Sequence, residues 1–185
     1  MKIMMVALWL MVVSLFSPLD AHAADSDNAQ DPQVKAQLNN YLWDAARNGD
    51  VSVIKTLIDA KYDLNTADNK GYTAIILAAY HGHDNTVKML IEAGADPCQR
   101  DKRGNSALMG AIFKGEIKVA RRLMNADCHP DQRNNAGQTA AMYASLFQRS
   151  ELLQALKERG ADMNAADNAG NSATTLSQGK INGIQ

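Results

Sequence analysis

The sequence is poor in aromatic residues and has no excess of charge of either sign. Phe, Trp and Tyr make up 5% of its 185 residues, and 19 basic against 20 acidic residues leave a formal net charge of -1. Nucleic-acid-binding proteins usually concentrate Lys and Arg on one face, whereas here the two signs are interspersed along the chain. The composition therefore argues against DNA or RNA as a partner and fits one ordinary soluble domain.

The chain also lacks the short motifs that usually mark an active site. It has no Gly-x-Ser-x-Gly segment and no glycine-rich phosphate loop. Beyond the N-terminal segment the histidines are His81, His83 and His129, which do not have the spacing of a metal site with three or four ligands. We therefore predict that the protein is not an enzyme and holds no metal and no cofactor.

Long apolar runs are absent except at the N-terminus. Met1 and Lys2 form a short basic start, residues 3–16 are almost wholly apolar, and the next segment ends in Ala21-His22-Ala23. These are the three regions of a secretory signal peptide, and the apolar core is shorter than the roughly 20 residues of a membrane-spanning helix. We expect cleavage after Ala23, export to the periplasm and a mature chain without a membrane anchor.

Several features recur at a fixed interval through the rest of the chain. The same 33-residue spacing separates four glycines, Gly71, Gly104, Gly137 and Gly170. It also separates four hydroxyl-alanine pairs, which begin at Thr73, Ser106, Thr139 and Ser172. A fixed period near 33 residues indicates stacked structural repeats.

Each unit has the pattern of helix, turn, helix and loop. In the clearest unit Thr73 can cap a first helix, which Gly82 interrupts. A second helix opens at Asp84 or Asn85, and Gly94 can end it in the left-handed conformation. The remaining loop is rich in Asp and Asn, which favours a hairpin turn.

This pattern resembles the ankyrin repeat from about residue 39 to about residue 178. The resemblance implies an all-α solenoid with a capping unit at about 38–68, full units at 69–101, 102–134 and 135–167, and a truncated unit at 168–185. Residues 24–37 are expected to form a flexible segment before the stack. Two departures predict less regular turns. Asp127-Cys128-His129 replaces the Gly-Ala-Asp triplet that occurs at 94–96 and 160–162, and Gln148 replaces the glycine between the two helices of a unit. Trp43 is expected to plug the core at the exposed end of the first unit.

The chain has two cysteines, Cys98 and Cys128, in neighbouring units. An exported chain with an even number of cysteines often pairs them. Regular neighbouring units lie about 10 Å apart, farther than the roughly 7 Å that a disulfide allows between Cα atoms. An irregular segment from Asp127 to Pro130 could close that gap, so we predict a disulfide. Two free, partly buried thiols are the alternative.

A stack of this kind offers a concave face made by the first helices and the loop tips. The 33-residue frame places Arg47, Tyr80, Phe113 and Leu146 in one row on it, followed by Asn48, His81, Lys114 and Phe147. Loop tips add Tyr72, Lys102, Arg103, Asn105 and Gln138. Because interface hot spots are enriched in Tyr, Trp and Arg, we predict a partner-binding surface at Arg47, Tyr72, Tyr80, His81, Arg103, Asn105, Phe113, Lys114, Leu146 and Phe147. Packing of the rings on neighbouring repeats is the alternative.

An export signal joined to a small ankyrin stack resembles the periplasmic ankyrin proteins associated with bacterial catalases. That resemblance implies a protein that binds another protein and supports a catalase or protection against peroxide; we expect it to be a monomer. Two alternatives stay open. One is an immunity protein that occupies the active site of a periplasmic toxin. The other is a haem-handling protein with His81 or His129 as axial ligand.

Overall fold

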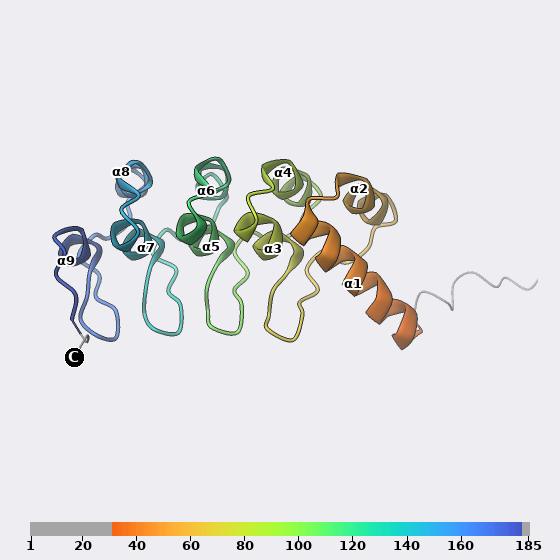
Figure 1. Cartoon of the computed structure of the whole chain (residues 1–185), viewed down its shortest axis with the longest axis horizontal. Helices are drawn as coiled ribbons and strands as arrows, with labels where there is room; N and C mark the ends of the chain where they lie inside the picture. The colour runs from red at the N-terminus through yellow and green to blue at the C-terminus, as the bar shows by residue number, and fades with distance from the viewer. Residues whose placement is uncertain (1–30, 183–185) are drawn as a thin grey trace, which may run out of the picture.

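The computed structural model describes residues 31–182, which form one row of helix pairs (Figure 1). One layer contains the first helix of each pair: α1 (Pro32–Asn48), α3 (Ala74–Tyr80), α5 (Ala107–Lys114), α7 (Ala140–Leu146) and α9 (Ala173–Ser177). A second layer contains α2 (Val51–Asp59), α4 (Asp84–Glu92), α6 (Ile117–Met124) and α8 (Ser150–Glu158). Long loops extend from the first layer on the side away from the second (Figure 1). The predicted all-α solenoid of 33-residue units is confirmed.

A hydroxyl side chain caps the first helix of four successive units. The Thr73 Oγ1 accepts a hydrogen bond from the Ile76 N–H at 3.5 Å. The same bond recurs at Ser106, Thr139 and Ser172 with distances of 3.3, 3.4 and 3.2 Å. Each cap satisfies one of the N–H groups that a helix leaves without a partner in its first turn. The helix starts therefore follow directly from the recurring Thr-Ala and Ser-Ala pairs.

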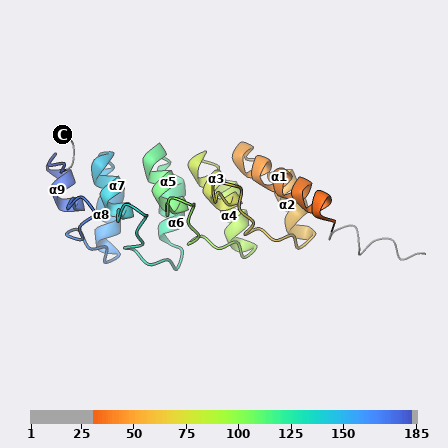
Figure 2. The same cartoon turned by 90° about the horizontal axis from the view of Figure 1, so that it is seen from below.

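Hydrogen bonds between neighbouring loops explain the period of the glycines. The Lys102 N–H donates to the Lys70 carbonyl over 3.0 Å, and Asn135 and Asn168 repeat this bond one and two units later. Gly71 has a left-handed backbone with φ of 83°, and a Cβ there would lie 2.7 Å from the Lys102 nitrogen. Only glycine permits both that conformation and that approach. Viewed from the loop side, the pairs follow one another in a single line (Figure 2).

The apolar core runs continuously along the stack between the two helix layers. Its largest fully buried side chains include Leu42, Ile75, Met109 and Leu152, from units along the whole row. At the N-terminal end Trp43 packs against this core, and its indole N–H donates to the Thr66 carbonyl at 3.1 Å. The predicted role of Trp43 as an end plug is thus consistent with its position. Among residues 31–182 no helix is both long enough and apolar enough to cross a membrane.

The stack begins earlier than the sequence predicts. Residues 32–37 belong to the segment expected to be flexible, but α1 already starts at Pro32. Asp31 accepts a hydrogen bond from the Gln33 N–H at 2.8 Å, and the fixed φ of Pro32 suits the first helical position. The start at about residue 38 is therefore corrected to residue 32. The expected signal peptide at 1–23 and the rest of the flexible segment lie outside the described residues.

Gln148 keeps the turn that glycine makes in the other units. Its φ is 54°, in the left-handed region. One unit earlier, a Cβ at Gly115 would lie 2.8 Å from the Arg149 guanidinium, so a side chain at that position would have to displace Arg149. The residue that corresponds to Arg149 one unit later is Asn182. Its N–H donates to the Asn171 side chain. We infer that residue 148 escapes the crowding that requires glycine at 115, so the expected irregularity there is small.

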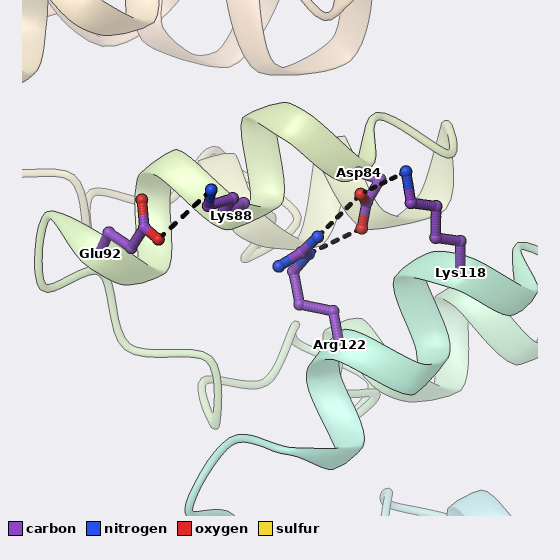
Figure 3. Close-up of polar contacts among 5 residues, drawn as sticks. All are labelled: Asp84, Lys88, Glu92, Lys118 and Arg122. Atoms are coloured by element: carbon purple, nitrogen blue, oxygen red, sulfur yellow. Dashed lines mark hydrogen bonds and ion pairs between the residues drawn. The ribbon is translucent and has the colours of Figure 1, made fainter.

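One ion cluster ties α4 to α6 on the second layer (Figure 3). The Asp84 carboxylate accepts two hydrogen bonds from the Arg122 guanidinium, at 2.7 and 2.8 Å, and lies 3.1 Å from the Lys118 ammonium. Lys88 and Glu92 form a looser pair on the same helix, at 3.8 Å. The hydrogen bonds from Arg122 are the main reason why the pKa of Asp84 falls from 3.8 to about 2. The carboxylate is therefore charged in all but strongly acidic solution.

Candidate protein-binding surface

Successive first helices end in a row of solvent-exposed apolar side chains. Tyr80 on α3, Phe113 on α5 and Leu146 on α7 expose 38%, 44% and 40% of their surface. The Tyr80 and Phe113 rings stack with centroids 6.2 Å apart, and Phe147 meets Phe113 edge-on at 4.9 Å. The rings thus pack on one another along the row and still face solvent. We call Tyr80, Phe113 and Leu146 the apolar row.

A groove of about 480 Å³ lies between the apolar row and the loops. It brings together most of the residues that the sequence predicts for partner binding: Arg47, Tyr72, Tyr80, His81, Arg103, Asn105 and Phe113. Lys114, Leu146 and Phe147 are not part of its lining. The Lys114 ammonium instead lies over the Tyr80 ring, 5.1 Å from its centroid. Seven of the ten predicted residues, from three units, therefore line one groove.

The floor of the groove was not foreseen from the sequence. It includes Leu77 on α3, Gly110 on α5 and Tyr143 on α7. These three residues occupy equivalent positions in successive units, 33 residues apart. An alignment of the units by their 33-residue period would have singled out Gly110, because Leu77 and Tyr143 at the same position carry large side chains.

Tyr143 and Asn105 form a hydrogen-bonded support beneath the loops. The Tyr143 hydroxyl donates to the Asn105 Oδ1 at 3.1 Å, and Asn134 donates to the same oxygen at 3.0 Å. The Asn105 amide nitrogen donates to Asp101 at 3.1 Å. Burial raises the pKa of Tyr143, so its hydroxyl stays protonated at neutral pH. Asn105, which the sequence predicts as a contact residue, therefore has both ends of its side chain bonded within the protein.

The rim of the groove on the loop side is basic. Lys70 and Arg103 are exposed there. The acidic neighbours Asp68 and Asp101 are turned into their own loops, where each accepts two backbone N–H bonds at 2.8 to 2.9 Å. Asp101 is only 8% exposed. The most exposed charged side chains at this rim are therefore the basic ones, Lys70 and Arg103, although the carboxylates beside them keep their charge.

The histidines have separate roles in the structure. The His83 Nε2–H donates to the Arg47 carbonyl at 2.9 Å, and the His83 ring lies over Gly49. His81 is largely exposed beside Tyr80, and partial desolvation of its ring, followed by the charges of His83, Arg47 and Lys114, lowers its pKa. His129 Nδ1 accepts from the Asp131 N–H at 3.1 Å. Within the described residues no three or more His, Cys, Asp or Glu side chains gather as a metal site would require.

Cys98 and Cys128 form a disulfide with Cα atoms 5.5 Å apart, as predicted, and the alternative of free thiols is excluded. In a regular unit the equivalent of Cys128 is Ala95, which is buried and donates its N–H to the Leu90 carbonyl at 2.9 Å. Cys128 instead donates to the Ala126 carbonyl at 2.8 Å. This local departure moves Cys128 out of the regular turn and closes the gap between the units.

Comparison with known proteins agrees with the geometry. A family model described as ankyrin repeats (3 copies) matches residues 12–101, 42–134 and 94–167. None of the curated proteins compared matches the chain. Ankyrin repeats are typically non-enzymatic modules that bind other proteins, and the matched residues cover most of the sequence. The chain therefore belongs to the ankyrin-repeat family.

Proposed function

We propose that the protein is exported to the periplasm and there binds one partner protein through the apolar row and the adjoining groove. The observation that carries this proposal is the exposure of Tyr80, Phe113 and Leu146, which retain about two fifths of their surface. Two aromatic rings and a leucine side by side form an exposed apolar patch, and such patches mark interaction sites. They are the residue types from which interface anchors are built, aromatic ones above all.

The first candidate partner is a catalase, for which the chain would act in protection against peroxide. Support comes from the expected export signal together with the small stack, the combination that resembles catalase-associated periplasmic ankyrin proteins. A supporting protein must leave the active site of its partner open. We therefore expect the catalase to keep its activity in the complex. A toxin partner, the alternative, would be silenced, so an activity assay on the purified complex separates the two.

A haem-handling role has weaker support. The Nε2 of His83 is already bonded to the Arg47 carbonyl, and the Nδ1 of His129 to the Asp131 N–H. His81 is thus the one of these three histidines left as a candidate axial ligand, because it is exposed and its lowered pKa favours the neutral imidazole that binds iron. We expect no Soret shift when haem is titrated into the protein. A shift that Ala in place of His81 removes would favour the haem role instead.

The binding proposal is tested by replacing Tyr80 and Phe113 with Ala in one variant. Because both rings are partly exposed, we expect the loss of partner capture from periplasmic extract with little change in the melting temperature. Tyr41→Ala is the matched control: Tyr41 is 62% exposed, on α1, and outside the groove. Capture that survives in the double variant would place the binding surface elsewhere. A large drop in melting temperature would show that the rings serve the core.

A further inference from the structure

Gly110 is a glycine that the fold does not require. It lies within α5, and it is absent from the glycines with positive φ in the described chain. A Cβ built at this position would meet only Tyr80, at an ordinary contact distance of 3.7 Å. Glycine in the interior of a helix is less stable than alanine. Its equivalents Leu77 and Tyr143 show that large side chains fit this column of the stack.

The missing side chain opens a notch in the floor of the groove. Leu77, Tyr80, Phe113 and Tyr143 line the same groove as Gly110, and Tyr80 is the side chain nearest to the place that a Cβ of residue 110 would take. The whole groove has a volume of about 480 Å³, within the range of roughly 300–1,000 Å³ found for ligand sites. The walls near Gly110 are mainly apolar, so burial of an apolar side chain of a partner there would be favourable.

The basic rim stands over this notch on the loop side. Lys70 and Arg103 are exposed, whereas the carboxylates of Asp68 and Asp101 are bound to N–H groups of their own loops. Arg47 adds a further cation at the N-terminal end of the groove and is paired with Asp44. A segment that lies in the groove therefore meets an apolar pocket and positive charge together. The complementary chemistry is an apolar side chain next to carboxylates.

We propose that the groove binds an extended acidic segment of a partner protein, which inserts one apolar side chain into the notch above Gly110. Carboxylates on either side of that residue pair with Lys70 and Arg103. This inference rests on the proposed function, because it assumes that the groove faces a protein partner. It adds the chemical class of the segment and the position of its anchor.

Fluorescein-labelled synthetic peptides test the proposal by fluorescence anisotropy on the purified protein. The probe peptide contains one central leucine between glutamates, and two matched peptides carry alanine for the leucine or lysines for the glutamates. Loss of a buried leucine weakens binding by about tenfold or more, and we expect at least that for each matched peptide. A probe peptide that does not bind, or that binds no more tightly than the other two, overturns the proposal. Equal binding of a poly-dT oligonucleotide would overturn it in favour of a nucleic-acid surface.

Two variants locate the site. Gly110→Leu fills the notch and is expected to weaken binding of the probe peptide by about tenfold or more, while Gly110→Ala, which fills less of it, has a smaller effect. The reversal Arg103→Glu should weaken binding and remove part of its salt dependence; Lys157→Glu, on the exposed face of α8, is the control for a change in net charge. Circular dichroism confirms that each variant is folded. Unchanged binding in Gly110→Leu contradicts the proposal.

Capture of the native partner by the variants distinguishes failure of the protein-binding proposal from failure of the notch proposal. If the Tyr80 and Phe113 variant loses the partner and Gly110→Leu retains it, the protein-binding function stands and the notch is not the anchor site. If both variants retain the partner, the groove is not used and both proposals fail. Loss of the partner from both, with loss of the probe peptide from Gly110→Leu, supports both.

Discussion

Single residues in this protein are best understood by comparison with their counterparts one unit away. Gly110 lies in the middle of α5 and Gly115 directly after its last residue, yet they are glycines for different reasons. Gly115 has a left-handed φ of 79° and lies under the Arg149 side chain. Gly110 has neither constraint, and its counterparts are Leu77 and Tyr143. One glycine therefore serves the fold, and the other leaves room in the groove.

This difference predicts opposite effects of alanine at the two positions. Gly110→Ala should raise the free energy of unfolding by about 0.5–1 kcal/mol, because alanine restricts the unfolded chain and favours helix. Gly115→Ala should lower it, because a Cβ there would be both in a strained conformation and too close to Arg149. Urea denaturation at neutral pH measures both. A destabilising Gly110→Ala would mean that the fold, and not a ligand, requires this glycine.

Between helices, the main polar tie in the second layer is the cluster around Asp84. The side chain of Asp84 is only 13% exposed, whereas the Lys55 and Asp59 pair on α2 exposes 65% and 62%. Exposed pairs within one helix are worth little, because solvent screens them. The Asp84 cluster instead joins α4 to α6 through a bidentate contact with Arg122, so it contributes to the stacking of two units.

The pKa of Asp84 predicts how this tie depends on pH. In the folded chain it is about 2, below the 3.8 of a free carboxyl group, so the stabilisation is complete above about pH 4 and is lost as the pH falls toward 2. Asp84→Asn should lower the free energy of unfolding by about 2 kcal/mol at pH 7, and the difference from the native chain should shrink near pH 2. Asp59→Asn is the control with little effect. Urea titrations at several pH values test this, and a pH-independent difference would contradict it.

At the scale of the whole molecule, each unit contacts only its neighbours. Such stacks gain stability from each unit and from each interface between units. The hairpin loops, the glycine turns and the hydroxyl caps repeat along the row and hold these interfaces in register. The Cys98–Cys128 disulfide is an additional, covalent link between two units in the middle of the row.

Loss of this link should destabilise the chain mainly through its unfolded state. The disulfide closes a loop of 30 residues, for which the chain-entropy model gives about 3–4 kcal/mol. Dithiothreitol should therefore lower the melting temperature of the native protein. A variant with alanine at both Cys98 and Cys128 should start from that lower value and show no response to the reductant. Equal melting temperatures for the native protein with and without reductant would contradict this account.

Much of the fold could be predicted from the sequence because its signals are local and periodic. The caps at Thr73 and Ser106, the left-handed turn at Gly94 and the apolar row all follow from residue type and a 33-residue spacing. The disulfide also followed, since the irregular segment around Cys128 could be recognised as a break in the Gly-Ala-Asp pattern. The early start of α1 was missed, because the Asp31 cap has no counterpart in the other units.

The candidate surface depended more on packing between units. The repeat frame alone placed Tyr80, Phe113 and Leu146 in one row, because equivalent residues of a solenoid lie side by side. Contacts between residues far apart in the sequence decide how exposed these side chains are. Such contacts also hold the Oδ1 end of the Asn105 side chain. The notch above Gly110 and the burial of Asp101 likewise depend on tertiary contacts. The order of residues was enough to specify the stack, since its bonds repeat locally, whereas the groove and its charge arise only where residues of four units meet.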